Sequence, residues 1–153
     1  MHAVVLAPGE GRTLDMGPFR MTLKVDSAVT GSGLTVLEAD EPPDFGPPLH
    51  IHEDAGEAFY VLAGEYLIFI EQAQHSCPAG SFIYIPAGVE HGFRVGETHS
   101  RKLNIYVPSA MEGYFEGLAN ANLEKQSLSD EQLSELAASH FMRVTGPMPE
   151  GYV

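Results

Sequence analysis

Three histidines and one glutamate near the middle of the chain have the side-chain types of a transition-metal site. His50 and His52 are separated by one residue, Glu57 follows shortly after them, and His91 lies farther along the chain. Imidazole nitrogens and carboxylate oxygens together suit Ni, Fe, Mn, Co, Cu or Zn far better than Mg or Ca. These residues therefore predict one divalent transition metal, without distinguishing among these elements.

The strands that carry these residues must bring their side chains together. Successive side chains of a β-strand point to opposite faces, so His50 and His52 are expected to point the same way. A short acidic turn then reverses the chain and returns Glu57 beside them. Within that turn, Glu53 or Asp54 is an alternative ligand to Glu57.

Glycines mark the turns that return the chain toward the predicted site. Gly64 ends the segment that begins at Glu57, and it allows the positive φ angle that a tight hairpin often needs. Farther on, a Pro-x-Gly turn at residues 86–88 precedes His91. We therefore expect His91 at the start of a strand, where it is the candidate fourth ligand.

Short apolar or alternating segments dominate residues 18–107, and clusters of Gly, Pro, Asp and Ser separate them. This pattern is typical of strands joined by turns, and it contains none of the helical segments that a βαβ architecture requires. The expected architecture is an antiparallel sandwich or barrel. The expected strands are residues 19–25, 33–40, 49–52, 57–64, 65–72, 81–86, 90–95 and 101–107.

The pattern becomes helical after Pro108. Ser109 with Glu112 reads as a capping box before one amphipathic helix, and Ser129 with Gln132 reads as the capping box of a second. The apolar residues of both helices are interpreted as packing surface, because their polar faces are acidic. The apolar residues of the two stripes are Met111, Tyr114, Phe115 and Leu118, then Leu133, Leu136, Ala137 and Phe141.

Length and charge limit the classes of protein that the chain can belong to. With 153 residues, the chain fits one domain. A formal net charge of −13 argues against nucleic acid or an anionic membrane as a partner. The single cysteine, Cys77, cannot form an internal disulfide, and the N-terminal residues do not read as a signal peptide, so we expect a cytoplasmic protein.

The two motifs that contain the candidate ligands resemble those of the cupin superfamily. The first cupin motif, G-x5-H-x-H-x3,4-E-x6-G, and the second, G-x5-P-x-G-x2-H-x3-N, are each matched with one departure. Gly46 lies too close to His50, and Val95 occupies the position of the final Asn. The matching positions are His50, His52, Glu57 and Gly64 in the first motif, then Gly80, Pro86, Gly88 and His91 in the second.

This resemblance implies an all-β fold, a jelly-roll β-barrel with a C-terminal pair of α-helices. The barrel is expected to span residues 1–108, and residues 109–153 form a helical extension packed on it. The resemblance also implies a metal held inside the barrel by His50, His52, Glu57 and His91. A six-coordinate ion with these four ligands keeps about two positions open, where substrate, water or dioxygen can bind.

Strand alternation suggests which side chains surround the predicted metal. Phe59 and Val61 share a face with Glu57, and Phe93 and Val95 share one with His91. These four residues predict an apolar substrate pocket that suits an aromatic small molecule better than a sugar phosphate. The alternative is that they simply fill the interior of a small barrel.

A narrower resemblance comes from the segments that follow the barrel. Residues 108–119, 129–141 and 144–147 are similar to the extension of single-domain bacterial cupins of the quercetin 2,3-dioxygenase type. This resemblance implies a metal-dependent dioxygenase that cleaves a flavonol or a similar enolisable aromatic hydroxy-ketone. Glu57 would accept the proton of the substrate's enol hydroxyl.

Two other classes of function fit the same residues. A non-redox cupin enzyme, such as a polyketide cyclase, isomerase or lyase, would use the metal as a Lewis acid and would keep its activity without oxygen. A small-molecule binding cupin would bind a ligand without turnover. The expected partners are an aromatic substrate, dioxygen and a second copy of the chain in a homodimer, because exposed sheet edges are commonly buried across a two-fold axis.

Overall fold

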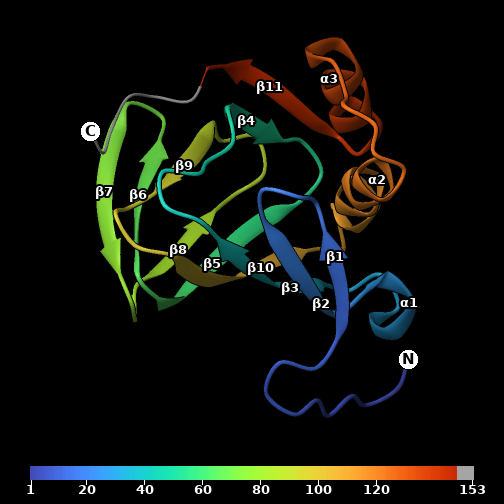
Figure 1. Ribbon diagram of the computed structural model, residues 1–153. Helices are drawn as coiled ribbons and strands as arrows, with labels where there is room; N and C mark the ends of the chain where they lie inside the picture. Colours follow the sequence, from blue (N-terminus) through green and yellow to red (C-terminus); the bar gives the residue numbers. More distant parts are fainter. Residues whose placement is uncertain (148–153) are drawn as a thin grey trace.

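Two antiparallel sheets face each other and enclose the core of the protein (Figure 1). In this computed structural model, which describes residues 1–147, the first sheet has the strand order β1-β2-β3-β10-β5-β8 and the second has the order β11-β4-β9-β6-β7. The arrangement is a jelly roll, as expected from the sequence. The strands are β1 (Arg12–Asp15), β2 (Arg20–Val25), β3 (Thr35–Glu41), β4 (Leu49–His52), β5 (Gly56–Ala63), β6 (Glu65–Ile70), β7 (Ala73–Pro78), β8 (Phe82–Ile85), β9 (His91–Val95), β10 (Ser100–Val107) and β11 (Met142–Gly146).

All eight expected strands are present, and three further strands were not predicted. β1 and β7 are short and mostly exposed, so they lack the regular apolar alternation that identifies a half-buried strand. β11 has only five residues, of which only Met142 is buried, and it is the edge strand that pairs with β4 after the two helices. Residues 148–153, which belong to the predicted C-terminal extension, lie outside the described residues.

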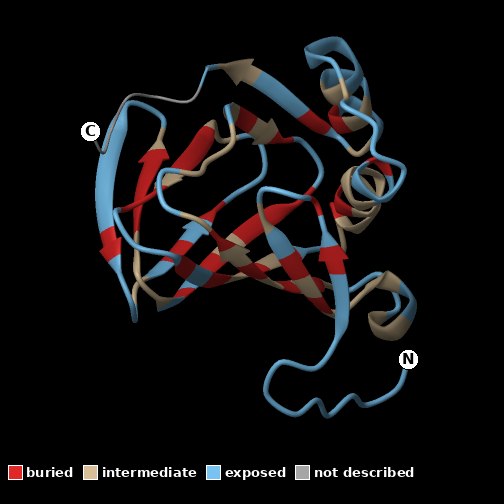
Figure 2. Cartoon of the chain, in the orientation of Figure 1, coloured by how far each residue is buried: buried red, intermediate tan, exposed pale blue. Residues whose placement is uncertain are grey.

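Alternation along the central strands separates the core from the outer surface. Every second residue of β3 is buried, and β10 shows the same alternation beside it, so both strands present one face to the space between the sheets (Figure 2). On β10, the buried positions include Lys102 and Asn104 as well as Tyr106. The interior of the barrel is therefore partly polar, and the fraction of apolar residues in the sequence does not indicate this.

Three helices complete the described chain: α1 (Ser27–Thr30), α2 (Glu112–Leu123) and α3 (Asp130–Ser139). The predicted capping box of α3 is confirmed, since Ser129 and Gln132 make both reciprocal hydrogen bonds. The predicted box at the start of α2 is wrong, because α2 begins after Met111 and no side chain caps it. The carboxylate of Glu112 instead accepts hydrogen bonds from the Ser27 backbone N–H at 3.1 Å and from the Thr35 hydroxyl at 2.8 Å.

α2 and α3 lie together beside one end of the barrel (Figure 1). α2 packs against β1, and α3 packs against β11 and α2. Within the described chain, no helix has both the length and the apolar content needed to span a bilayer.

Candidate metal centre

Strands from both sheets bring His50, His52, Glu57 and His91 into one cluster. One ligand atom of each residue lies within 4.8 Å of the corresponding atoms of the others, and all four side chains are buried. His50 on β4 is directly opposite His91 on the adjacent β9. Glu57 comes from β5 in the other sheet and closes the cluster across the barrel interior.

Backbone carbonyls orient two of the three imidazole rings. The Nδ1 atom of His50 donates to the carbonyl oxygen of Pro48, and that of His91 donates to the carbonyl oxygen of Val89, each at 2.9 Å. A carbonyl oxygen can only accept a hydrogen bond, so the proton must lie on Nδ1 in both rings. Nε2 is then the atom that each ring turns toward the cluster, as in metal sites where the other ring nitrogen is held by an outer hydrogen bond.

His52 provides an independent test of whether the cluster fits a metal. Its two ring nitrogens are buried and have no hydrogen-bond partner in the structure. Its Nε2 lies 3.6 Å from the carboxylate Oε1 of Glu57. A buried polar nitrogen without a partner is costly, and coordination of a metal ion satisfies it. The donor set of three imidazoles and one carboxylate therefore fits a transition ion.

The ionisation of the cluster also favours metal binding. Burial, with added repulsion from His91 and His52, lowers the pKa of His50 to about 3, so this ring is neutral at pH 7. Burial alone would raise the pKa of Glu57, but the neighbouring imidazole of His52 and the hydrogen bond with His91 hold it well below its usual range. Neutral imidazole and ionised carboxylate are the forms that bind a metal.

His91 carries the proton that neutralises the cluster when no metal is bound. Its Nε2 lies 2.8 Å from Oε1 of Glu57. Burial alone would lower the pKa of His91, but this hydrogen bond and the carboxylate charge raise it above its ordinary value. A metal that binds here must displace this proton.

The two alternative ligands from the acidic turn lie outside the cluster. Glu53 and Asp54 are both exposed. The carboxylate of Glu53 accepts a hydrogen bond from Nε of Arg143 at 3.0 Å. The turn therefore directs these two side chains toward solvent, while Glu57, at the second position of β5, points inward.

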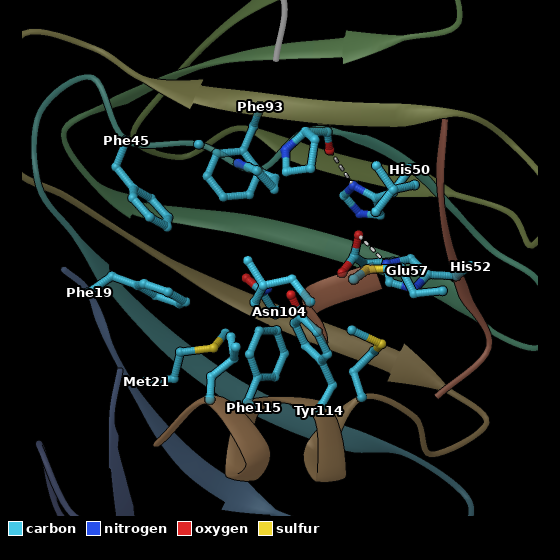
Figure 3. A pocket seen from close by; sticks show the side chains of 18 of the residues that line it. Phe19, Met21, Phe45, His50, His52, Glu57, Phe93, Asn104, Tyr114 and Phe115 are labelled. Atoms are coloured by element: carbon cyan, nitrogen blue, oxygen red, sulfur yellow. Dashed lines mark hydrogen bonds and ion pairs between the residues drawn. The ribbon is translucent and has the colours of Figure 1, made fainter. Parts of the chain in front are cut away.

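A cavity of about 580 Å³ opens beside the cluster, and most of its lining is apolar (Figure 3). Phe59 and Phe93, two of the four expected pocket residues, line it. Val61 and Val95, the other two, are fully buried in the core cluster formed with Tyr66 and are not among the lining residues. They lie two positions farther along β5 and β9, where the space between the sheets is filled with side chains.

The C-terminal helices line the same cavity. Met111, Tyr114, Phe115 and Leu118, the predicted apolar stripe of the first helix, all contribute to its wall. Leu133 of α3 contributes as well, so the helices cover the pocket in addition to packing on the barrel.

Sequence reasoning did not identify three polar residues of the pocket wall. Tyr106 lies directly opposite Glu57 across β10 and β5, and its ring is 5.4 Å from that of His52 between centroids. Burial and the nearby Glu57 raise the pKa of Tyr106 well above its usual value, so its hydroxyl remains a hydrogen-bond donor at neutral pH. Asn104 and Glu41 also line the cavity. Their inward positions follow from alternation on β10 and β3, but their function depends on the facing strands.

The fold and this cluster resemble those of a cupin, and comparison with known proteins supports this resemblance. The family described as "Cupin domain" matches residues 37–106, a range that contains all four candidate ligands. This match supports the resemblance of the chain to the cupin superfamily.

The similar proteins differ in what their names state. Quercetin 2,3-dioxygenase of Bacillus subtilis (strain 168) is 25% identical over 116 residues, which cover 76% of this chain and 34% of that protein. The chain thus spans about a third of the length of this curated relative. An RmlC-like cupin from Shewanella frigidimarina NCIMB 400 is 15% identical with a TM-score of 0.61, covering 71% of this chain and 93% of that chain. The polyketide cyclase RemF from Streptomyces resistomycificus is 22% identical with a TM-score of 0.52, covering 65% and 69%. The two structural likenesses show the fold alone.

Proposed function

We propose that this protein is a metal-dependent dioxygenase that cleaves a flavonol or a similar enolisable aromatic hydroxy-ketone. The observation that carries the proposal is the buried cluster of His50, His52, Glu57 and His91 facing a largely apolar, aromatic-walled cavity. The similarity to a quercetin 2,3-dioxygenase supports the same reaction class. A cavity of about 580 Å³ has the size of a site for a small molecule with two or three rings.

The four cluster residues would hold a divalent transition metal. Such an ion, when bound, makes a coordinated enol hydroxyl more acidic and allows electrons to pass between the substrate and dioxygen. Glu57 accepts the proton of the enol hydroxyl at a carboxylate oxygen. Tyr106 lies opposite Glu57, and its neutral hydroxyl is available to donate a hydrogen bond to the substrate anion.

The cavity wall contributes orientation and protection. Phe59 and Phe93 give flat apolar surfaces against which an aromatic ring can pack. Phe115 and Leu118 of α2 close another side of the cavity and limit the access of bulk water. A planar substrate is thereby held with its enol oxygen toward the histidines and its rings among apolar side chains.

The test begins with the metal content of the purified protein, followed by assays of flavonols with and without oxygen. We expect substrate loss only in the presence of oxygen, with release of carbon monoxide if cleavage follows the quercetinase reaction. Full turnover under anaerobic conditions would assign the protein to the non-redox enzymes instead. Binding of the flavonol without turnover in either atmosphere would support a binding protein.

Replacement of Glu57 tests the proton-accepting step. Glu57→Gln keeps the shape of the side chain but removes the base, so turnover should fall at least about 100-fold while part of the metal is retained. Glu53→Gln is the matched control, because Glu53 is an exposed acid of the same turn and pairs with Arg143. Equal turnover of the Glu57→Gln variant and the native protein would exclude Glu57 as the base.

We also propose that the protein forms a homodimer through the outer face of its six-stranded sheet. Tyr60 on β5, Phe82 and Tyr84 on β8 and Val107 on β10 are large apolar residues that are 42% to 64% exposed. Tyr60 and Phe82 are paired across the adjacent strands. A second copy would cover this apolar face.

A further inference from the structure

A second charged group lies inside the barrel, apart from the candidate metal centre. Lys102 is 0% exposed and Glu41 is 1% exposed, and the ammonium Nζ of Lys102 lies 2.9 Å from Oε1 of Glu41. The Tyr66 hydroxyl donates to the same oxygen at 2.8 Å. Lys102 also faces three aromatic rings, the closest being Phe93 at 4.1 Å from its centroid.

Stability alone does not account for this pair. Removing two charges from water costs several kcal/mol for each ion, and an apolar replacement of similar volume is often neutral or stabilising. The charges of Lys102 and Glu41 cancel within the pair, and the pair adjoins the apolar cavity, since Glu41 is one of the lining residues. The position of the pair beside the cavity therefore indicates a role in ligand binding.

Asn104 connects the pair to the candidate metal centre. Its Oδ1 accepts a hydrogen bond from Nζ of Lys102 at 2.9 Å, and its Nδ2 makes only a long contact of 3.5 Å with the Tyr106 hydroxyl. Tyr106, Asn104 and Lys102 are successive inward residues of β10, opposite Glu57, Phe59 and Val61 of β5. Inward positions repeat about every 6 to 7 Å along a strand, so Lys102 lies about 13 Å along β10 from the level of Glu57.

The hydrogen bonds leave two groups with capacity to bind a ligand. Lys102 and Tyr66 both use Oε1 of Glu41, which leaves Oε2 as the acceptor of this carboxylate. Lys102 occupies the oxygen of Asn104, which leaves its Nδ2 as a donor. Figure 3 shows Asn104 pointing into the cavity between Glu57 and the aromatic side chains on the far side. A carboxylate only accepts hydrogen bonds, so the group that binds Glu41 must be a donor.

We propose that Glu41 and Asn104, held in place by Lys102 and Tyr66, form a second binding subsite that selects an aromatic ligand with a phenolic hydroxyl remote from its metal-binding oxygens. The remote hydroxyl donates to Oε2 of Glu41 and accepts from Nδ2 of Asn104. This proposal rests on the proposed function only in taking the same cavity as the substrate site. It adds recognition of the remote hydroxyl, which the metal centre does not contact.

Aryl hydroxamic acids test the subsite without any turnover. A hydroxamate binds transition metals through two oxygens, so it anchors one end of the probe whatever the natural substrate is. Benzohydroxamic, 2-naphthohydroxamic and biphenyl-4-hydroxamic acids, each with and without a hydroxyl at the distal ring position, span the distance from the metal to Glu41. Their dissociation constants are measured by calorimetry on zinc-loaded protein.

For the probe whose length matches the distance from the metal to Glu41, the distal hydroxyl should lower the dissociation constant about ten- to a hundredfold. This is the range expected of a hydrogen bond to a charged group. Glu41→Leu combined with Lys102→Met removes both charges together and should abolish this preference while the zinc content stays unchanged. Asn104→Leu, which leaves the ion pair intact, should weaken the preference. Glu38→Gln is the matched control, since Glu38 lies on the same strand and pairs with Lys24 on the outer face.

Three results would overturn the subsite: no hydroxyl preference at any length, no binding of any probe to the zinc-loaded protein, or an undiminished preference in the double variant. If the double variant does not fold, the native protein and Asn104→Leu decide the question. The proposed dioxygenase activity fails separately, because a protein that prefers hydroxylated hydroxamates but leaves every flavonol intact would keep the subsite and lose the reaction.

Discussion

At the scale of single residues, the barrel interior holds charge in two different ways. Lys102 and Glu41 neutralise each other directly, and further hydrogen bonds complete the pair. Glu57 is surrounded by imidazoles, and in the metal-free protein a hydrogen bond from the protonated His91 compensates part of its charge. His52 has no such compensation, because both of its nitrogens lack a partner. The charges of the first group thus cancel without any further ion, while the second group has an unpartnered nitrogen that a metal ion would satisfy.

The pH dependence of the metal-free protein follows from the opposite pKa shifts of His50 and His91. Below its unfolded pKa of 6.5, His50 takes up a proton when the protein unfolds but stays neutral in the folded state down to about pH 3. Its contribution to the free energy of unfolding is therefore lost as the pH falls below 6.5. His91 acts in the opposite sense: its contribution is present below 6.5 and is lost as the pH rises through its raised pKa. Together they place the stability maximum near pH 6.5.

Urea denaturation of chelator-treated protein at pH 4 to 8 measures this maximum. His50→Gln removes the titrating ring. The difference between the unfolding free energies of this variant and the native protein should therefore change with pH below 6.5, by at most about 1.4 kcal/mol per pH unit. Glu57 adds to the acid loss below its usual pKa in both proteins, and the comparison cancels it. A difference that does not vary between pH 6.5 and 4 would contradict a neutral, buried His50.

At the scale of elements, the hairpin between β5 and β6 fixes the strand that carries Glu57. Gly64 has a φ angle of +75°, and a Cβ atom there would lie 2.0 Å from Oγ of Ser100. That hydroxyl accepts a hydrogen bond from the backbone N–H of Glu65 at 3.0 Å and is completely buried. The glycine is required by the close approach of β10 as well as by its backbone conformation.

Replacement of Gly64 by alanine should lower the free energy of unfolding by about 2 to 4 kcal/mol. Strain at positive φ accounts for about 1 to 3 kcal/mol of this loss, and displacement of the buried Ser100 hydroxyl for the remainder. Gly80→Ala is the matched control, because Gly80 has a φ angle of +91° but no atom within 4 Å of the added Cβ. The measurement is the urea midpoint at constant m-value, and equal losses in the two variants would exclude the close contact as a cause.

The C-terminal helices change the character of the site as well as covering it. α2 begins where Glu112 bonds to Ser27 and Thr35, so its position depends on contacts with the first sheet. From there, Met111 and Phe115 extend into the cavity wall. The division of the chain into a barrel and a helical extension remains a prediction, and the pocket takes residues from both parts.

At the scale of the whole molecule, one face of the six-stranded sheet is unusually apolar for a surface. The exposed side chains of Tyr60, Phe82, Tyr84 and Val107 lie on neighbouring strands of this sheet. β8 is also an edge strand, which leaves backbone groups available for a partner. A homodimer would remove both features from water.

Light scattering after size exclusion should therefore give twice the chain mass of 16.6 kDa. Phe82→Lys combined with Tyr84→Lys should shift the mass to that of the monomer, because two buried ammonium groups oppose association. Leu123→Lys is the matched control, since Leu123 is 81% exposed at the end of α2, which packs against β1 at the edge of the sheet opposite β8. A monomeric native protein, or a dimer unaffected by the double change, would exclude this face.

The sequence by itself determined the features that depend on local spacing. Alternation of apolar residues indicated eight strands, and the spacing of His50, His52, Glu57 and His91 indicated a cluster, because side-chain direction along a strand follows from its period of two. The capping box of α3 was also local, since it involves only Ser129 and Gln132. Such patterns are fixed by the backbone geometry of one segment.

Only the tertiary structure decided what each inward residue contacts. Val61 and Phe59 both point inward from β5 and belong to the same core cluster, but only Phe59 also reaches the cavity wall. Lys102 and Glu41 are 61 positions apart, and their ion pair exists because β3 and β10 are adjacent in the sheet. Contacts between distant segments depend on strand order, which spacing within one segment does not encode.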